Sequence, residues 1–118
     1  MTTRLRNAAI FALTVVAALA AGGAARALTF EDIAGKWCGD VSSYVFARDK
    51  LTVILLSDNS QRIYPVDEYA YDDEVVTVTW KRGDDPFITE FGEFSADRQS
   101  MVQLENDVGP RREFRRCS

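Results

Sequence analysis

The amino-acid sequence predicts an all-β fold: one small antiparallel barrel of seven or eight strands that follows a signal peptide and one short helical turn. Val, Ile, Thr and aromatic residues come in short runs separated by turn-forming residues, which is typical of strands. Seven or eight such strands in about 80 residues favour a meander closed into a barrel, or a compact sandwich. The chain has 118 residues, the length of one ordinary domain.

The first 27 residues differ in composition from the rest and predict an export signal. They contain 10 alanines and no acidic residue, whereas the other 91 contain 4 alanines and all 18 acidic residues. Arg4 and Arg6 precede an apolar run, and the small residues up to Ala27 are typical of a cleavage site. An uncleaved anchor is the alternative, but the run of about fourteen residues is shorter than the roughly twenty of a spanning helix. We expect Sec-type export, cleavage after Ala27, a periplasmic or secreted protein, and one domain over 28–118.

The first element of that domain is a helical turn over Thr29–Ala34, with Thr29 as the N-cap and Gly35 as the stop. Everything after Gly35 is predicted as strand or turn. The expected strands are Lys36–Asp40, Ser43–Ala47, Lys50–Leu56, Gln61–Tyr69, Glu74–Lys81, Phe87–Phe94, Ser100–Leu104 and Arg111–Cys117.

Period-two alternation assigns the side chains of these strands to two faces. Within 75–80, the even-numbered residues share one face and the odd-numbered residues share the other. In the seventh strand, Val102 and Leu104 are expected to face inward and Met101 and Gln103 outward. This alternation supports the strand assignments.

Two residues predict irregular strands. The aromatic spacing in Phe87–Phe94 changes parity at Gly92, where a bulge would restore it. Pro65 lacks an amide donor, which predicts a strand edge or a bulge. With these shifts, Glu68 and Glu93 could face inward, where a buried carboxyl has a perturbed pKa.

The two cysteines, Cys38 and Cys117, lie near the two ends of the predicted domain. In an exported protein they are expected to form a disulfide, which in the chain-entropy model stabilises by roughly 4 kcal/mol over so long a loop. If that disulfide lies on the outer face, parity points both Trp37 and Arg116 inward. Stacking of the guanidinium on the indole would contribute about 0.5 to 2 kcal/mol to stability. The first and last strands would then be neighbours.

The run Gly35-x-Trp37 after a helical turn, with Arg116 on the last strand, resembles the opening and closing of the calycin (lipocalin-like) superfamily. That resemblance implies a small up-and-down barrel that binds ligands in its mouth or inhibits hydrolases at its rim, with these three residues closing the barrel. The run Asp32–Trp37 is similar to the opening of bacterial periplasmic metalloprotease inhibitors. The segments 93–97, 101–103 and 109–114 resemble a second family of exported bacterial proteins. This resemblance implies no activity.

Composition argues against several functions. After residue 27 the chain has 11 basic and 18 acidic residues, a net charge of −7, which excludes nucleic acid as the expected partner. The sequence contains no His, which excludes His-based acid–base catalysis, Ser-His-Asp triads and the common zinc sites. Oxidised cysteines leave no thiolate nucleophile. No cofactor or metal site is therefore predicted.

Clustered carboxylates are the remaining candidates for chemistry. Asp72–Glu74 and Asp84–Asp85 could bind calcium or act as an acid/base pair. Neither cluster has the alternating spacing of a calcium loop, and both fall where hairpin turns are expected. We interpret them as solvated turn residues.

One segment has the composition of a contact surface. Tyr69 and Tyr71 lie among acidic residues that include Asp72 and Asp73, and tyrosines in such loops are common contact residues. The segment is predicted to be an exposed partner-binding loop. The alternative is that one tyrosine packs inward and the other is a bystander.

These observations predict a monomeric, non-enzymatic binding module that contacts a protein or an envelope component through its loops, without stable membrane insertion after cleavage. The first alternative is an inhibitor of a periplasmic or extracellular hydrolase that inserts the 69–74 loop or the mature N-terminal tail. A small-ligand carrier is ranked third. The many aromatic side chains must fill most of the core, which leaves little room for a ligand cavity. An enzyme, which would need two inward carboxylates in one cleft, is the least expected.

Overall fold

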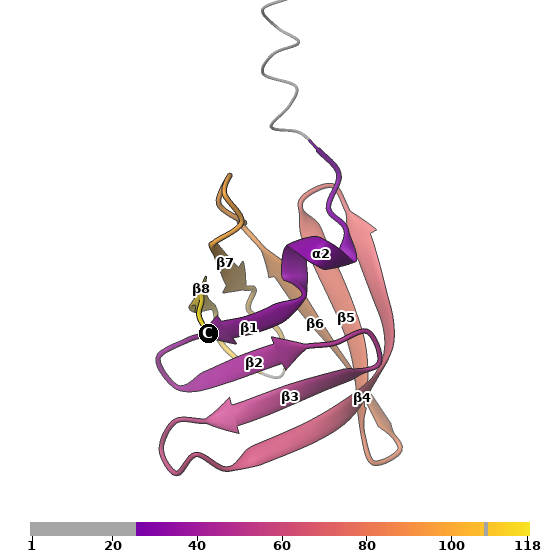
Figure 1. Cartoon of the computed structure of the whole chain (residues 1–118). Helices are drawn as coiled ribbons and strands as arrows, with labels where there is room; N and C mark the ends of the chain where they lie inside the picture. The colour runs from indigo at the N-terminus through magenta and orange to yellow at the C-terminus, as the bar shows by residue number, and fades with distance from the viewer. Residues whose placement is uncertain (1–25, 108) are drawn as a thin grey trace, which may run out of the picture.

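The computed structural model describes residues 26–107 and 109–118. Within these ranges the turn α2 (Phe30–Ile33) precedes eight strands, which pair antiparallel in chain order and close into a barrel because β8 also pairs with β1 (Figure 1). The predicted barrel is confirmed, and the alternative of a sandwich is wrong. The strands are β1 (Gly35–Cys38), β2 (Ser42–Phe46), β3 (Lys50–Leu55), β4 (Gln61–Asp72), β5 (Val75–Arg82), β6 (Asp85–Gly92), β7 (Ser100–Gln103) and β8 (Arg112–Arg116).

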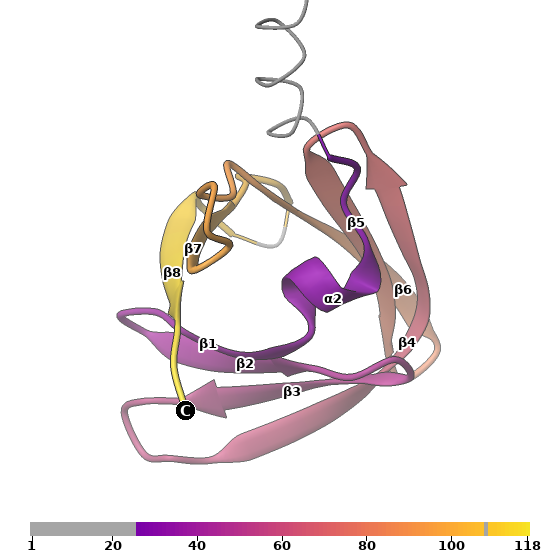
Figure 2. The same cartoon turned by 45° about the horizontal axis from the view of Figure 1, so that its top comes forward.

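The turn α2 lies inside the ring of strands at one end of the barrel (Figure 2). Its start is capped as the sequence predicts: the backbone N–H of Thr29 donates to Asp32 Oδ2 at 2.8 Å. Gly35, with φ of 97°, ends the turn in a conformation that L side chains rarely adopt. The chain can therefore turn from the mouth of the barrel directly into β1.

Aromatic rings fill the interior. Tyr44 stacks on Phe114 with 4.8 Å between ring centroids, and Phe46 meets Phe91 edge-on at 5.2 Å. Farther along the barrel, Trp80 stacks on Phe87 at 4.9 Å, and its indole N–H donates to the buried Thr89 hydroxyl. The even-numbered side chains of β5 (Val76, Val78 and Trp80) all lie in this core, as the alternation predicts.

The faces of β7 are the reverse of those predicted. Met101 lies in the core opposite Phe114, and Gln103 also points inward, where its side-chain oxygen accepts a hydrogen bond from the Tyr44 hydroxyl at 2.7 Å. Val102 is buried between its strand neighbours on the outer face. The assignment was wrong because it placed the polar amide outside, whereas an interior hydroxyl satisfies that amide.

Neither irregularity makes a carboxylate face inward. At Gly92 the strand β6 ends instead of bulging, and Glu93 turns the chain with φ of 51°. Pro65 lies within β4, and a register shift follows it between Val66 and Glu68, so a bulge is present there. Both Glu68 and Glu93 are exposed, so the expectation of an inward carboxylate is wrong.

Candidate functional site

Barrel closure places Trp37 of β1 directly opposite Arg116 of β8. The guanidinium carbon lies 4.2 Å from the indole centroid, and Trp37 is fully buried. The indole N–H donates to the carbonyl of Ile33 at 2.9 Å, which ties β1 to α2. The stack therefore joins β1 to β8, and the indole hydrogen bond joins β1 to the turn that precedes it.

Arg116 also completes the end of α2. Its Nη atoms donate to the backbone carbonyls of Asp32, at 2.8 Å, and of Ala34, while its Nε donates to the carbonyl of Arg98 at 3.2 Å. The carbonyls of Asp32 and Ala34 are ones that a short helical turn leaves without internal partners, whereas that of Arg98 belongs to the segment between β6 and β7. Burial lowers the pKa of Arg116, against the opposing charge of Asp32. Arg116 thus has a structural role. Gly35 has one as well, because a Cβ at this position would lie 3.2 Å from Arg116 Nη1.

A buried carboxylate at this mouth was not singled out from the sequence. Asp32 is 5% exposed; its oxygens accept hydrogen bonds from Arg26 at 2.9 and 3.2 Å, and Arg98 Nε lies 3.4 Å from Oδ1. Burial disfavours the ionised carboxylate, but the hydrogen bonds from Arg26 and Thr29 and the charges of Arg26 and Arg98 outweigh it and lower the pKa of Asp32. The spacing Thr29-x-x-Asp32 is the sequence signal that indicates this residue.

Because its pKa is lowered on folding, Asp32 is expected to stabilise the fold above its ordinary pKa of 3.8 and to lose that effect as the pH falls below it. The difference in free energy of unfolding between wild type and Asp32→Asn should be largest near neutral pH. It should shrink between about pH 4 and the lower folded-state pKa. Urea unfolding at a series of pH values measures this difference.

This comparison and its control both use a chain that retains Arg26. The matched control is Arg26→Gln, which removes one cation and leaves the carboxylate in place. An NMR titration of the Asp32 side chain should show its pKa moving back towards the ordinary value in this variant. A difference between wild type and Asp32→Asn that stays constant from pH 7 to pH 3 would contradict the assignment.

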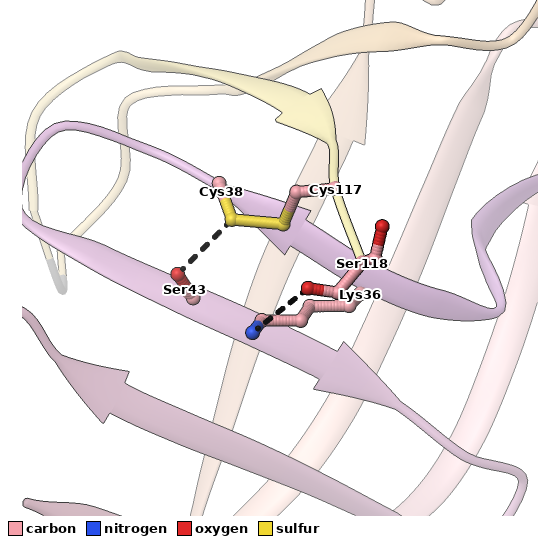
Figure 3. Close-up of a disulfide and its surroundings, with 5 residues drawn as sticks. All are labelled: Lys36, Cys38, Ser43, Cys117 and Ser118. Atoms are coloured by element: carbon pink, nitrogen blue, oxygen red, sulfur yellow. Dashed lines mark hydrogen bonds between the residues drawn. A yellow bond between two sulfur atoms is a disulfide. The ribbon is translucent and has the colours of Figure 1, made fainter. Parts of the chain in front are cut away.

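The predicted disulfide is confirmed: Cys38 at the end of β1 bonds Cys117, which follows β8, with 5.9 Å between their Cα atoms (Figure 3). The hydroxyl of Ser43 on β2 donates to Cys38 Sγ at 3.5 Å, and Lys36 Nζ lies 3.5 Å from the carbonyl of Ser118. The cross-link therefore lies at the junction of β1 and β8.

The predicted partner-binding loop is not a loop. Tyr69, Tyr71 and Asp72 belong to β4, and only Asp73 lies in the turn that leads to β5. Tyr69 packs inward against Phe30 at 5.1 Å between centroids and donates its hydroxyl to the carbonyl of Ala47. Burial raises the pKa of Tyr69, as do, to a lesser extent, Tyr71 and Asp49. Tyr71, 39% exposed, and the exposed Asp72 and Asp73 remain available for contact.

An open groove of about 820 Å³ lies beside the disulfide, and we name it the seam groove. The turn after β1 forms one wall, and β8 with parts of β7 forms the other. Two of the arginines in the groove are paired. Arg111 donates two hydrogen bonds to Glu93, at 2.6 and 2.7 Å, and Arg112 Nη1 lies 3.9 Å from Asp40 Oδ1. The lining residues are Cys38, Gly39, Asp40, Glu93, Ser100, Met101, Val102, Arg111, Arg112, Glu113, Phe114 and Arg115.

The acidic clusters are exposed as predicted, but only in part do they lie in turns, because Asp72 ends β4 and Asp85 begins β6. Asp73 and Glu74 lie in the turn between β4 and β5, and Asp84 lies in the turn before β6, where all three are exposed. Within residues 26–107 and 109–118, no three His, Cys, Asp or Glu side chains are arranged to hold a metal ion. In the same part of the chain, no helix has the length and apolar character needed to cross a membrane.

The chain matches no protein-family model, and neither curated proteins nor solved structures give a match. Any functional assignment therefore depends on the geometry described above.

Proposed function

We propose that this chain is an exported, non-enzymatic binding module that contacts a protein or an envelope component through the seam groove. The observation that carries this proposal is the groove itself, whose volume of about 820 Å³ lies within the range of ligand sites. The exposed Glu113 and Arg115 form no ion pair with any other described residue. Such charges can select a partner of complementary charge.

Export is part of this proposal. The Cys38–Cys117 disulfide supports an oxidising compartment, and the N-terminal composition supports a signal peptide. Most of that segment, residues 1–25, lies outside the described residues. Cleavage after Ala27 would remove Arg26 but keep Leu28, which is 5% exposed and lies in the core. A mature chain that begins at Leu28 thus has its first side chain in the barrel, which argues against an inserting N-terminal tail.

We also propose that the chain is a calycin-like barrel. Strands that pair in chain order, a helical turn in the mouth and the stack of Arg116 on Trp37 support this resemblance. Within this proposal a small-ligand carrier is disfavoured, because the rings of Tyr44, Phe46 and Phe91 occupy the interior.

A hydrolase inhibitor is the second candidate, and the end of the β4–β5 hairpin favours it. Tyr71 is exposed there, beside Asp72 and the turn at Asp73, and the hairpin rises next to α2 (Figure 1). A tyrosine on an exposed hairpin end can act as an interface anchor. This candidate uses a different surface from the seam groove, so variants separate the two.

Affinity capture from an envelope extract tests both candidates with the purified protein and two variants. Arg115→Glu reverses a charge in the seam groove, and Tyr71→Ala truncates the hairpin anchor. We expect one partner that wild type and Tyr71→Ala retain and that Arg115→Glu loses. Lys50→Glu, an equal charge reversal at an exposed residue outside the groove, is the matched control.

A hydrolase lost only by Tyr71→Ala would replace the leading proposal with the inhibitor. A partner retained by all variants would contradict both surfaces, as would the absence of any partner.

A further inference from the structure

We propose that the seam groove binds an extended peptide segment of its partner as an added antiparallel strand on β8. This inference deepens the proposed function and rests on it. It specifies the part of the partner that is recognised, the backbone groups that recognise it and the pattern of charges that it carries.

The pairing between β1 and β8 is short. Only two residue pairs join them, Trp37 with Arg116 and Cys38 with Arg115, whereas four pairs join β8 to β7 on its other side. After Cys38 the chain leaves β8 and turns into β2, and Gly39 N–H donates to the carbonyl of Ser42 at 2.9 Å. No described strand therefore covers this edge of β8 before Arg115.

The close approach at Gly39 fixes where the two strands separate. A Cβ on Gly39 would lie 2.8 Å from the ring of Phe114 and 3.1 Å from the carbonyl oxygen of Ser42. The turn can pass over the Phe114 ring only because this position has no side chain. The groove opens directly after it, between Asp40 and β8.

The backbone groups of Glu113 point into this opening. Along an antiparallel strand, successive residues direct their N–H and C=O groups to opposite neighbours. Arg116 N–H donates to Gln99 beside β7, and Cys117 N–H donates to Lys36 of β1. By this alternation Glu113, like Cys117, directs its N–H and C=O towards the β1 side, where the groove lies. An added strand can exchange both hydrogen bonds with it.

Opposite charges lie at the open edge of β8 and at the residue before it. Glu113 and Arg111, which precedes β8, are both exposed. Cys38 lies opposite Arg115 and Gly39 passes against Phe114, so an added strand can place residues only opposite 111–113. Opposite charges directly across a strand pair are stabilising, and like charges are destabilising. The complementary segment is thus basic-x-acidic, with its basic residue opposite Glu113 and its acidic residue opposite Arg111. Every strand pair of the barrel is antiparallel, so we assign the same direction to the added strand.

The N-acetylated peptide Lys-Val-Glu-Val-Thr tests the proposal by NMR titration of the purified protein. We expect the largest amide shift changes along Arg111–Glu113 and in the turn at Asp40. The charge-reversed peptide, N-acetylated Glu-Val-Lys-Val-Thr, should bind about fivefold more weakly, because two cross-strand pairs become repulsive.

Methylation of single peptide nitrogens separates strand addition from simple charge attraction. N-methylation of the peptide's Lys removes the N–H that donates to Glu113 and should abolish the shift changes. N-methylation of the Val that follows it, whose N–H points away from β8, should leave them. Equal binding of these two peptides would overturn strand addition.

A charge exchange completes the design. Glu113→Lys should prefer the peptide whose Lys is replaced by Glu, by about fivefold. Glu90→Lys is the matched control, because Glu90 is exposed on β6 and its strand is paired on both sides. It should keep the wild-type preference.

The failure of this proposal is distinguishable from failure of the proposed function. If no peptide binds at millimolar concentration while the protein still captures a partner that Arg115→Glu loses, strand addition is wrong and the binding module stands. If peptides bind as expected but no partner is captured, the mode of recognition stands and the envelope partner is wrong.

Discussion

Replacing Trp37 by alanine is expected to lower the free energy of unfolding by about 3 to 5 kcal/mol, the usual cost of truncating a fully buried Trp. The expected loss lies in the upper part of this range because three contacts disappear together. The ring of Phe94 meets the indole edge-on at 6.2 Å, the guanidinium of Arg116 lies over it at 4.2 Å, and the carbonyl of Ile33 accepts its N–H. Urea unfolding followed by far-ultraviolet circular dichroism measures the loss independently of the tryptophan signal.

Two variants calibrate this result. Trp37→Phe keeps a ring in the core and leaves the Ile33 carbonyl without its donor, so we expect a smaller loss of about 1 to 3 kcal/mol. Ile88→Thr changes a strand side chain that is 57% exposed and should alter stability by less than about 0.5 kcal/mol. A loss below about 1 kcal/mol for Trp37→Ala would contradict the packing of α2 and β1 around this residue.

The junction of the first and last strands could be predicted because parity and covalent chemistry constrain the same few residues. A disulfide on the outer face at Cys38 forces Trp37 inward, and the same step from Cys117 forces Arg116 inward. The structure places these residues accordingly. The helical turn was also predictable, because its cap and its stop are local signals carried by Thr29 and Gly35.

Parity alone failed where a polar side chain finds its partner inside the barrel. Gln103 has the composition of an outer residue, and only the position of Tyr44, 59 residues away, makes the interior favourable for it. Tyr69 is a similar case, because a carbonyl 22 residues earlier accepts its hydroxyl. Pairs this distant follow from the closed sheet and its register, which no local pattern specifies.

The seam groove could not be found from the sequence for a related reason. Its opening depends on how far β1 follows β8 before the turn at Gly39, which is a property of the closed barrel. The sequence contains four arginines within 111–116, but Glu93 and Asp40 are brought against Arg111 and Arg112 only by folding. The composition therefore indicated that this segment is charged. The register of the closed sheet determined which of its charged side chains form ion pairs.

Replacing both Cys38 and Cys117 by serine is expected to lower the free energy of unfolding by roughly 4 kcal/mol. The two residues are 79 positions apart, and a loop of this length gives that value in the chain-entropy model. Chemical denaturation of the double variant measures the loss, and wild type treated with a reductant should shift by the same amount. The reductant should leave the double variant unchanged, which controls for effects other than disulfide cleavage.

The same variant should also open the barrel locally, because the cross-link acts at one of the two shortest strand pairings of the barrel. Two residue pairs join β1 to β8, whereas six join β4 to β5. Hydrogen exchange should accelerate most at Arg115 and Cys117, whose amides face β1, while the amides of β4 and β5 keep their protection. Since one wall of the seam groove begins at Cys38, the variant should bind the Lys-Val-Glu-Val-Thr peptide more weakly even where it remains folded. Uniform acceleration over all strands would mean that the disulfide stabilises the barrel as a whole and does not hold the seam.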